Sequence, residues 1–289
     1  MANQVKLNIT KVAHLLGHKD AIYDFVVDHK EGYIYSVGAD GYVIQWDIAN
    51  PSDGVMLMQA GEALYSVYKF GDRLMVGSRS GKVYKVDLIS HSLIRSEKVH
   101  KGGVFFVRES FSGGEDGCLY VPSLKQRIQI SKNSLRCIAT GNHAMYIGAS
   151  DSCIYELDPH TYEVLDVMKG HTNSVFGLHL QDNNTLWSTG RDAHIIAHDL
   201  TIKKEVFRVP AHRYQVKHLS SNSQLTLSCS MDKTIKVWDD RLNLLKVIDY
   251  ERYQGHTNCI NKTAWVDENM FVSCSDDRSI VFWKVEIMD

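Results

Sequence analysis

The sequence has little of several things that mark special classes of protein. Its 289 residues include only four prolines, too few for a disordered proline-rich arm. It contains no run of about eighteen apolar residues, and the opening stretch MANQVKLNITKVAHLLG lacks the basic flank and long apolar core of a signal peptide. These absences predict an ordered protein of the cytoplasm with no membrane segment.

The chain also has almost no excess of charge of either sign. A formal net charge of −2 removes the bulk attraction on which non-specific nucleic-acid binding depends, so any basic patch must be local. The six cysteines include no C-x-x-C pair, and no glycine-rich phosphate loop or nucleotide fingerprint is visible. We therefore expect no metal and no cofactor, and a nucleic-acid partner is not favoured.

What the sequence does have is an internal repeat. The stretch SCSMDKTIKVWD, from Ser228 to Asp239, is typical of a polar turn followed by an alternating strand. Six further copies of this frame occur: SVGADGYVIQWD from Ser36, VGSRSGKVYKVD from Val76, SGGEDGCLYVPS from Ser112, IGASDSCIYELD from Ile147, STGRDAHIIAHD from Ser188 and SCSDDRSIVFWK from Ser273. Their starts are separated by 40, 36, 35, 41, 40 and 45 residues, a period typical of stacked supersecondary units. We therefore expect one domain spanning residues 1–289.

A second segment, a turn followed by a strand, precedes each frame. Its two main apolar positions lie three residues apart, whereas a strand with one buried face repeats every two residues. The first of these positions holds Ile22, Leu64, Val104, Leu135, Val175, Val216 and Ile260. A β-bulge would place both side chains on one face, so we expect a bulge in the first strand of every unit.

The residues of these units resemble a known family. Gly17-His18, a strand, Ser36-x-x-x-Asp40 and then Trp46-Asp47 are similar to a WD40 repeat, and the seven units together resemble the WD40-repeat family. The resemblance implies an all-β fold, a seven-bladed β-propeller of four-stranded antiparallel blades. Only five residues follow Trp283-Lys284, too few for a fourth strand. The N-terminal segment from Gln4 to Leu16 should therefore close the ring as the outer strand of the last blade.

In this family the histidine, serine, aspartate and tryptophan of one unit form a hydrogen-bonded chain inside the blade. Complete sets are His18, Ser36, Asp40 and Trp46; His212, Ser228, Asp232 and Trp238; and His256, Ser273, Asp277 and Trp283. At the tryptophan position the fifth unit has His198 and the third has Pro122, which should shorten that strand. The second unit lacks the chain and the fourth keeps only Asp151, so we expect these two blades to be weak.

A serine, a histidine and an aspartate close together also suit a hydrolase. The trio recurs in five units, however, whereas a catalytic site is needed once and lies in a cleft beside an oxyanion hole. We therefore interpret the trios as buried polar groups that satisfy one another, and we expect no enzyme.

Better-known propellers of this family bind partners on the narrow face around the channel, at positions that can be transferred to this sequence. Those positions include Tyr23, Tyr65, Arg79, Phe105, Arg136, Phe176, Arg191 and Lys217. Aromatic and arginine side chains are typical of interface hot spots, although the rings could instead only plug the channel mouth.

The resemblance and these residues together imply a non-catalytic scaffold, monomeric within a larger complex. Its expected ligand is a protein or peptide segment that is acidic with apolar anchors. The alternative is recognition of a phosphorylated or nucleic-acid ligand by the basic residues Arg79, Arg136, Arg191 and Lys217.

Overall fold

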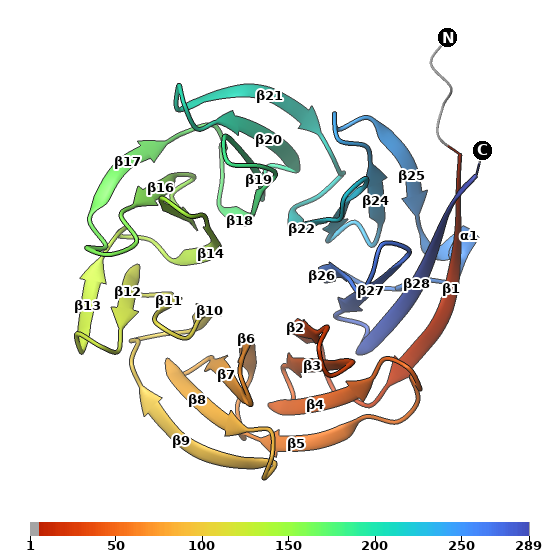
Figure 1. Cartoon of the computed structure of the whole chain (residues 1–289), viewed down its shortest axis with the longest axis horizontal. Coiled ribbons are helices and arrows are strands. Elements are labelled where there is room, and N and C mark those ends of the chain that lie inside the picture. Colours follow the sequence, from red (N-terminus) through yellow and green to blue (C-terminus); the bar gives the residue numbers. More distant parts are fainter. Residues whose placement is uncertain (1–5, 289) are drawn as a thin grey trace.

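The chain forms a closed ring of seven blades around a central opening (Figure 1). The structure is a computed structural model that describes residues 6–288, and each blade in it is a four-stranded antiparallel sheet. Within these residues the only helix is the single turn α1, Tyr250–Tyr253. The predicted all-β fold, a seven-bladed propeller, is therefore confirmed.

The strands of each blade run in order from the channel outward. The innermost strands are β2 (Ile22–Asp28), β6 (Leu64–Phe70), β10 (Val104–Val107), β14 (Leu135–Thr140), β18 (Val175–Leu180), β22 (Val216–Ser221) and β26 (Ile260–Trp265). The second strands are β3 (Tyr33–Gly38), β7 (Arg73–Ser78), β11 (Ser112–Gly114), β15 (Met145–Ala149), β19 (Thr185–Gly190), β23 (Thr226–Ser230) and β27 (Met270–Ser275).

The two outer positions complete each blade. The third strands are β4 (Tyr42–Asp47), β8 (Lys82–Asp87), β12 (Cys118–Val121), β16 (Ile154–Leu157), β20 (His194–Asp199), β24 (Ile235–Trp238) and β28 (Ser279–Met288). The outermost are β5 (Val55–Gln59), β9 (Ser92–Lys98), β13 (Gln126–Gln129), β17 (Val164–Met168), β21 (Lys204–Pro210), β25 (Leu244–Ile248) and β1 (Lys6–Leu16).

All seven innermost strands contain the predicted β-bulge. In β2 the register shifts between Ile22 and Asp24, and the other six strands shift at the matching place. The shift lets Ile22 and Phe25 both lie fully buried at 0% exposure although they are three residues apart. The one extra residue in each strand is left out of the ladder, so the bulge can aim its side chain away from the blade.

The tight turn between the second and third strands also recurs in every blade. The residue that follows the turn aspartate position has a positive φ in all seven blades. In blades 1 to 3 it is glycine: Gly41 (φ 75°), Gly81 (φ 90°) and Gly117 (φ 71°). In blades 4 to 7 it is Ser152 (φ 69°), Ala193 (φ 66°), Lys233 (φ 69°) and Arg278 (φ 72°). These four side chains tolerate a conformation that favours glycine because the aspartate before each accepts hydrogen bonds from the turn backbone.

The ring is closed as expected, by a strand from the start of the sequence. β1 pairs with β28 from Lys6 opposite Met288 to Leu16 opposite Ser279, which makes it the outer strand of blade 7 (Figure 1). The first residues of the predicted closing segment, 4 and 5, lie outside the described residues. Leu7 and Ile9 of β1 are buried at 3% and 4% exposure.

Blade 3 has the short third strand that its proline predicts. β12 ends at Val121, directly before Pro122, whereas β24 of blade 6 includes the matching Trp238; with four residues β12 is as long as β16 and β24 and shorter than β4, which contains six. The apolar core of the molecule lies between blades, in clusters of buried side chains shared by neighbours. These clusters hold the blades as one ring and fix the positions of the inner strands around the channel.

Candidate functional site

A chain of hydrogen bonds crosses the interior of blades 1, 6 and 7. In blade 1, Trp46 Nε1 lies 2.8 Å from Ser36 Oγ, which lies 2.8 Å from His18 Nε2. His18 Nδ1 in turn lies 2.9 Å from Asp40 Oδ2. An indole can only donate, so Ser36 donates its own proton to His18 Nε2, and His18 Nδ1 donates to Asp40.

Blades 6 and 7 repeat this order. The tryptophan–serine, serine–histidine and histidine–aspartate distances are 2.8, 2.7 and 3.0 Å in blade 6 and 2.8, 2.7 and 3.1 Å in blade 7. Their members are His212, Ser228, Asp232 and Trp238, and His256, Ser273, Asp277 and Trp283. The structure thus brings together all twelve residues that the sequence assigned to complete chains.

Blades 3 and 5 carry shortened chains. In blade 5, His198 Nε2 takes the tryptophan's place, 2.9 Å from Ser188 Oγ, and His198 Nδ1 is left buried without a partner. In blade 3, Ser112 Oγ lies 2.8 Å from His100 Nε2, but Pro122 offers no donor at the tryptophan position.

The histidine chain is absent from blades 2 and 4, as expected, but each of these blades contains another polar network. In blade 2 the acceptor is the carboxylate of Glu62, which precedes the first strand. It accepts from Ser80 Oγ at 2.9 Å and from the Tyr84 hydroxyl at 2.8 Å. In blade 4, Asp151 accepts from Ser131 Oγ and, at 2.7 Å, from the Tyr155 hydroxyl. Each blade has therefore replaced the histidine chain with a tyrosine network, because the frame places a tyrosine where blade 1 has an aliphatic residue.

The histidine chains are closed to any substrate. The histidine side chain has 0% exposure in all five blades that carry one. Burial alone would raise the pKa of Asp192, but the hydrogen bond from His171, with backbone N–H donors, outweighs it and holds that pKa at about 2. Such a buried, fully paired trio has the properties of a structural element rather than of an activated nucleophile.

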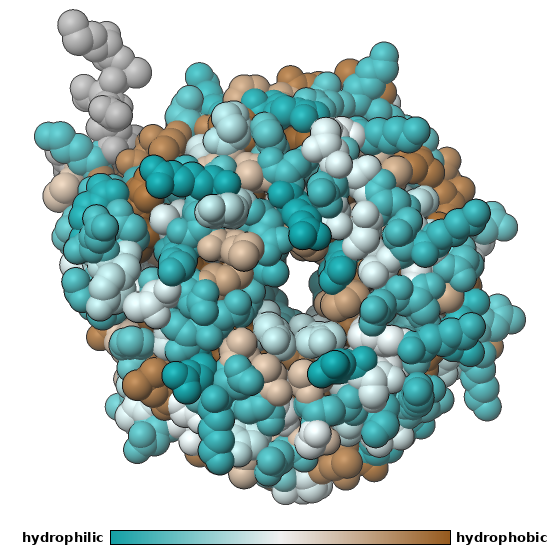
Figure 2. Space-filling model, turned by 180° about the vertical axis from the view of Figure 1, so that it is seen from behind, coloured by the Kyte–Doolittle hydropathy of each residue, from teal (hydrophilic) through white to brown (hydrophobic). Residues whose placement is uncertain are grey.

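The predicted rim residues, by contrast, meet at the channel. The extra residues of the seven bulges, here called the rim ring, are Tyr23, Tyr65, Phe105, Arg136, Phe176, Lys217 and Asn261. All seven are half-buried, and all seven line one cavity of about 430 Å³ along the channel. Seen from behind the view of Figure 1, the centre of the ring is open in the space-filling view (Figure 2), so these side chains surround the channel and do not plug it.

Successive members of the rim ring touch one another. The rings of Tyr23 and Tyr65 meet edge to face with centroids 5.5 Å apart, and those of Tyr65 and Phe105 are stacked at 5.6 Å. The Arg136 guanidinium lies 4.2 Å from the Phe105 centroid and 5.8 Å from that of Phe176. Lys217 Nζ follows, 5.3 Å from the Phe176 centroid.

Asn261 completes the circle back to blade 1. Its Nδ2 donates to the Ile22 carbonyl at 2.8 Å and to Asp276 Oδ1 at 2.7 Å. Six side chains, from Tyr23 to Lys217, therefore form one line of aromatic and cationic groups around the channel, and Asn261 lies between its ends. Aromatic and cation–π pairs of this kind are each worth roughly 0.5–1.5 kcal/mol, so the ring is held in place before any ligand arrives.

Two predicted partner-binding residues lie beside the ring. Arg79 and Arg191 are exposed, and their backbone N–H groups donate to the carbonyls of Ala63 and Ser174 at 2.9 and 2.8 Å. These bonds fix both residues to the turn that precedes the bulge of their own blade. The structure thus groups six of the eight predicted residues in the ring and leaves the two arginines exposed beside it.

Within the described residues, the four cations of this rim form no ion pair. Among residues 6–288, no carboxylate lies within ion-pair distance of Arg79, Arg136, Arg191 or Lys217. Arg136 Nε donates to Ser150 Oγ at 2.8 Å, and burial lowers the pKa of this arginine. An anionic group brought to the rim would therefore meet cations that are already positioned and partly stripped of water.

The sequence analysis missed the residues deeper in the channel. Asp24 follows the bulge of β2, and its Oδ1 lies 2.6 Å from Lys262 Nζ, which follows the bulge of β26. Both line the channel together with Arg108. The sequence does contain a signal for these residues. After each bulge the strand resumes its alternating pattern, and one face of the strand lines the channel.

Across residues 6–288, no three histidine, cysteine, aspartate or glutamate side chains gather in a way that could hold a metal ion. In the same part of the chain no helix has the length and apolar character needed to cross a membrane.

Comparisons with known proteins agree with this architecture. The family model for the WD domain, G-beta repeat, matches residues 9–47, 203–239 and 249–284. The crystal structure of the WD40 β-propeller domain of Doa1 superposes with a TM-score of 0.82 at 18% identity, covering 96% of this chain and 97% of that one. A likeness at this level of identity concerns the fold alone.

Two curated relatives match part of the chain. The ubiquitin fusion degradation protein 3 homolog of Caenorhabditis elegans is 26% identical over 49% of this chain and 17% of its own length. The ribosome biogenesis protein WDR12 homolog of Drosophila mojavensis is 26% identical over 40% of this chain and 28% of its own length. The matches thus span less than a third of either relative. Three segments of this chain thus match the WD40 repeat, and the seven like blades together form a seven-bladed β-propeller.

Proposed function

We propose that this protein is a non-catalytic interaction scaffold that binds an acidic, apolar-anchored segment of a protein partner at the rim ring. The observation that carries the proposal is the line of aromatic and cationic side chains from Tyr23 to Lys217 along the channel, whose cations form no ion pair within residues 6–288. The names of the two curated relatives, one in ubiquitin fusion degradation and one in ribosome biogenesis, favour work alongside protein partners here as well.

The chemistry of the ring matches such a ligand. Tyr65 and Phe105 present a stacked apolar surface that a partner's aliphatic or aromatic side chain can cover. Arg136, between Phe105 and Phe176, offers guanidinium donors to a carboxylate. Because neighbouring contacts already fix these side chains, binding loses little rotamer entropy, which is the property of hot-spot residues.

The test is a change of three rim residues to alanine: Tyr65, Arg79 and Phe105. Peptides selected by display on the wild-type protein should be rich in acidic residues with one or two apolar positions. We expect the triple variant to bind them about 30-fold to 1,000-fold more weakly in calorimetry, because a hot-spot residue contributes about 2–4 kcal/mol. None of the three belongs to a polar chain, so the melting transition should stay cooperative. Equal affinity of both proteins for the selected peptides would remove the rim from consideration.

The second candidate is a phosphorylated or nucleic-acid ligand held by Arg79, Arg136, Arg191 and Lys217. The unpaired state of these four cations favours it. Salt separates the two candidates: binding to several phosphates falls as a steep power of salt concentration, whereas an aromatic-anchored peptide gives a shallow slope. A cytoplasmic location and a monomeric propeller within a larger complex complete the proposal.

A further inference from the structure

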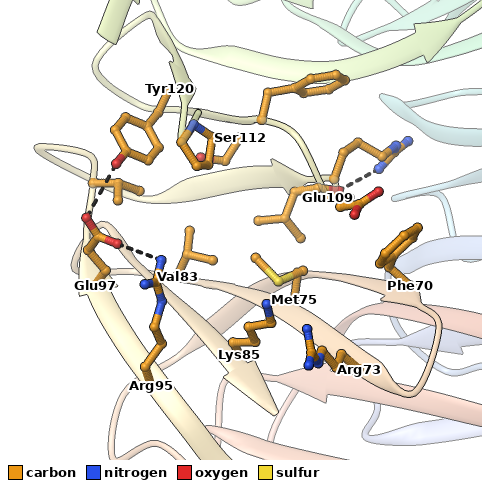
Figure 3. Close-up of a pocket in the computed structure, with 15 residues that line it drawn as sticks. Phe70, Arg73, Met75, Val83, Lys85, Arg95, Glu97, Glu109, Ser112 and Tyr120 are labelled. Carbon is orange, nitrogen blue, oxygen red and sulfur yellow. Dashed lines mark hydrogen bonds and ion pairs between the residues drawn. The ribbon is translucent and has the colours of Figure 1, made fainter. Parts of the chain in front are cut away.

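The boundary between blades 2 and 3 is packed differently from the rest of the ring. Six clusters of buried apolar side chains join neighbouring blades: 1 with 2, 3 with 4, 4 with 5, 5 with 6, 6 with 7, and 7 with 1. Among the described residues no such cluster joins blade 2 with blade 3. A cavity of about 170 Å³ lies there instead (Figure 3), and we call it the seam cavity.

The cavity follows from the residue at the tryptophan position. That side chain packs against the preceding blade: Trp46 shares a cluster with residues of blade 7, Trp238 with blade 5 and Trp283 with blade 6. In blade 3 the same position is Pro122, which is too small to fill the space and lines the cavity. Ser112, which bonds to His100 as the matching serines of other blades bond to their histidines, also lines the cavity.

The size of the cavity matches one aromatic ring. A protein cavity of about 150 Å³ with apolar walls takes up a benzene molecule. The inner walls of the seam cavity are largely apolar: Met75 and Val83 point into it from blade 2, opposite Ser112 of blade 3 (Figure 3), and Phe111 lines it from the β10–β11 turn. A phenyl group can therefore pack against these walls, while the guanidinium of Arg108 also lines the space.

Positive charge dominates the lining. It contains four cations and two carboxylates: Arg73, Lys85, Arg95, Arg108, Glu97 and Glu109. Arg95 pairs with Glu97 at 3.1 Å, and Glu97 also accepts from the Tyr120 hydroxyl at 3.4 Å, which bridges the two blades at the outer end (Figure 3). Within residues 6–288, Arg73, Lys85 and Arg108 have no carboxylate at ion-pair distance.

Arg108 is the most deeply placed of these cations. It donates to the Val107 carbonyl at 2.8 Å and stacks over the Tyr68 ring at 5.1 Å. Burial lowers its pKa. A guanidinium has five N–H donors, so most of the hydrogen-bonding capacity of this buried group is unused by the chain itself.

The surface around the cavity extends beyond a single ring. Phe70, at the end of β6 opposite to the rim ring, lines the cavity and is 47% exposed. Leu93 and Ile94 of the outer strand β9, which also supplies Arg95 and Glu97, are 47% and 46% exposed. A ligand that fills only the cavity leaves these apolar groups in water, whereas a peptide with residues on either side of the anchor covers them.

From the missing cluster, the size of the cavity and its unpaired cations, we infer that the seam between blades 2 and 3 is a second binding site. Its ligand is an acidic peptide segment that inserts one aromatic side chain between the blades. The acidic residues beside that ring pair with Arg73 and Lys85. The seam cavity adjoins the channel cavity, because Val107 and Arg108 line both, but no residue of the rim ring lines it, and the site does not depend on a ligand being bound at the rim.

The probe for this site is a short capped peptide, Glu-Glu-Phe-Glu-Glu, with azidophenylalanine in place of phenylalanine for photochemical labelling. We expect binding that can be measured at millimolar peptide, with labelled residues mapped by mass spectrometry to the β6–β7 turn, to β8 or to Phe111. Replacing the phenylalanine of the probe by alanine, or its glutamates by glutamine, should weaken binding by about tenfold or more.

Variants of the protein test the cavity and the charge separately. Pro122→Trp restores the side chain that other blades use to fill this space, so it should raise the melting temperature and abolish probe binding. Val83→Phe fills the cavity from the other side and serves if Pro122→Trp folds poorly. Arg73→Glu should weaken binding by about tenfold, while Lys132→Glu, an exposed change of equal charge in blade 4, should not.

Each remaining result bears on the inference directly. The rim variant with alanine at residues 65, 79 and 105 should bind the probe as the wild type does, and Pro122→Trp should keep full affinity for rim ligands. Loss of the probe in the rim variant would show that the peptide reads the rim and not the seam. Probe affinity that survives both filling variants, labelling outside the seam, or no binding at millimolar peptide overturns the inference.

Discussion

The guanidinium of Arg136 lies 4.2 Å from the centre of the Phe105 ring, across the boundary between blades 3 and 4. Both residues are the extra residue of a β-bulge, so the same backbone irregularity aims a cation and a ring at each other. The stacking holds the charge at the channel although, among the described residues, no carboxylate forms an ion pair with Arg136. The bulge is thus the link between the strand pattern of the sequence and the chemistry of the rim.

Arg136→Met tests this charge while keeping a long side chain over Phe105. We expect affinity for the acidic rim peptides to fall by about tenfold or more, because a charged partner in a bidentate pair is lost. Unfolding free energy should change by no more than about 1–2 kcal/mol, the size of one cation–π contact. Arg127→Met, an exposed change on β13, is the matched control and should leave both calorimetric affinity and stability unchanged. If Arg136→Met binds the rim peptides as tightly as the wild type, the acidic group of the peptide pairs with a cation other than Arg136.

Closure of the ring by β1 can be tested with two single changes on that strand. Ile9 is buried at 4% exposure and Val12 is exposed at 54%. Ile9→Ala should lower the free energy of unfolding by about 2–4 kcal/mol, since it empties a packed site, while Val12→Ala should be neutral. Deletion of residues 1–16 should leave β28 as an unpaired edge and cause aggregation or loss of a cooperative transition in calorimetry. A truncated protein that melts like the full chain would falsify the closure.

Much of this structure could be predicted from the sequence because the same residue pattern recurs in seven units. The spacing of three between Ile22 and Phe25 has one simple explanation in a strand, a bulge, and it recurs in every unit. Pro122 cannot donate to a ladder, so the end of β12 also followed from one residue. Local rules sufficed wherever a single residue type forces a backbone feature.

The features that were missed depend on which side chains meet across units. Glu62 precedes the first strand of its blade, whereas the aspartate of a histidine chain lies in the turn between the second and third strands. An alignment of the repeats therefore shows only that blade 2 lacks the histidine and the aspartate. The seam cavity needs the knowledge that the tryptophan position packs against the preceding blade. Neither relation is local in sequence, and both decide how the blades of this protein differ from one another.

Glu62→Ala tests whether blade 2 has a working substitute for the polar chain. The change removes the acceptor of the Ser80 and Tyr84 hydroxyls, so we expect a loss of about 1–3 kcal/mol of unfolding free energy in denaturant titrations. Rim affinity should be retained. A neutral result would restore the expectation that blade 2 lacks a stabilising polar network.

Asp232→Ala makes the corresponding change in a complete chain. Asp232 accepts from His212 Nδ1 at 3.0 Å and from Thr234 Oγ1 at 2.7 Å, so its loss leaves buried donors unpaired. We expect a loss of about 1–3 kcal/mol in stability and unchanged affinity for rim peptides. Asp240→Ala, at an exposed neighbouring position, is the control and should be neutral. Unaltered melting together with lost binding would reverse the assignment of these residues as structural.

The last prediction is that acid destabilises the protein through protonation of one histidine, His198. Burial lowers the pKa of His198 to about 4, from about 6.5 in an unfolded chain. Its Nε2 donates to Ser188, so a proton added in acid has to go to Nδ1, which is buried and has no acceptor. The folded protein therefore favours the neutral form of His198. The stability that results from this preference is complete above about pH 6.5 and is lost as the pH falls towards about 4.

His198→Trp separates this histidine from other acid-sensitive groups. Gly170 leaves room beside residue 198, as Gly17 does beside Trp46, and an indole at this position can donate to Ser188 without titrating. The wild type should lose on the order of 1–3 kcal/mol of stability between about pH 6.5 and about pH 4.5, and the variant should lose distinctly less. Below about pH 4 both should lose stability together, as Asp116 and Asp192, whose pKa values the fold holds at about 2, become protonated. Denaturant titrations across this range decide the matter, since parallel curves for the two proteins above pH 4 would mean that His198 is not the group that titrates.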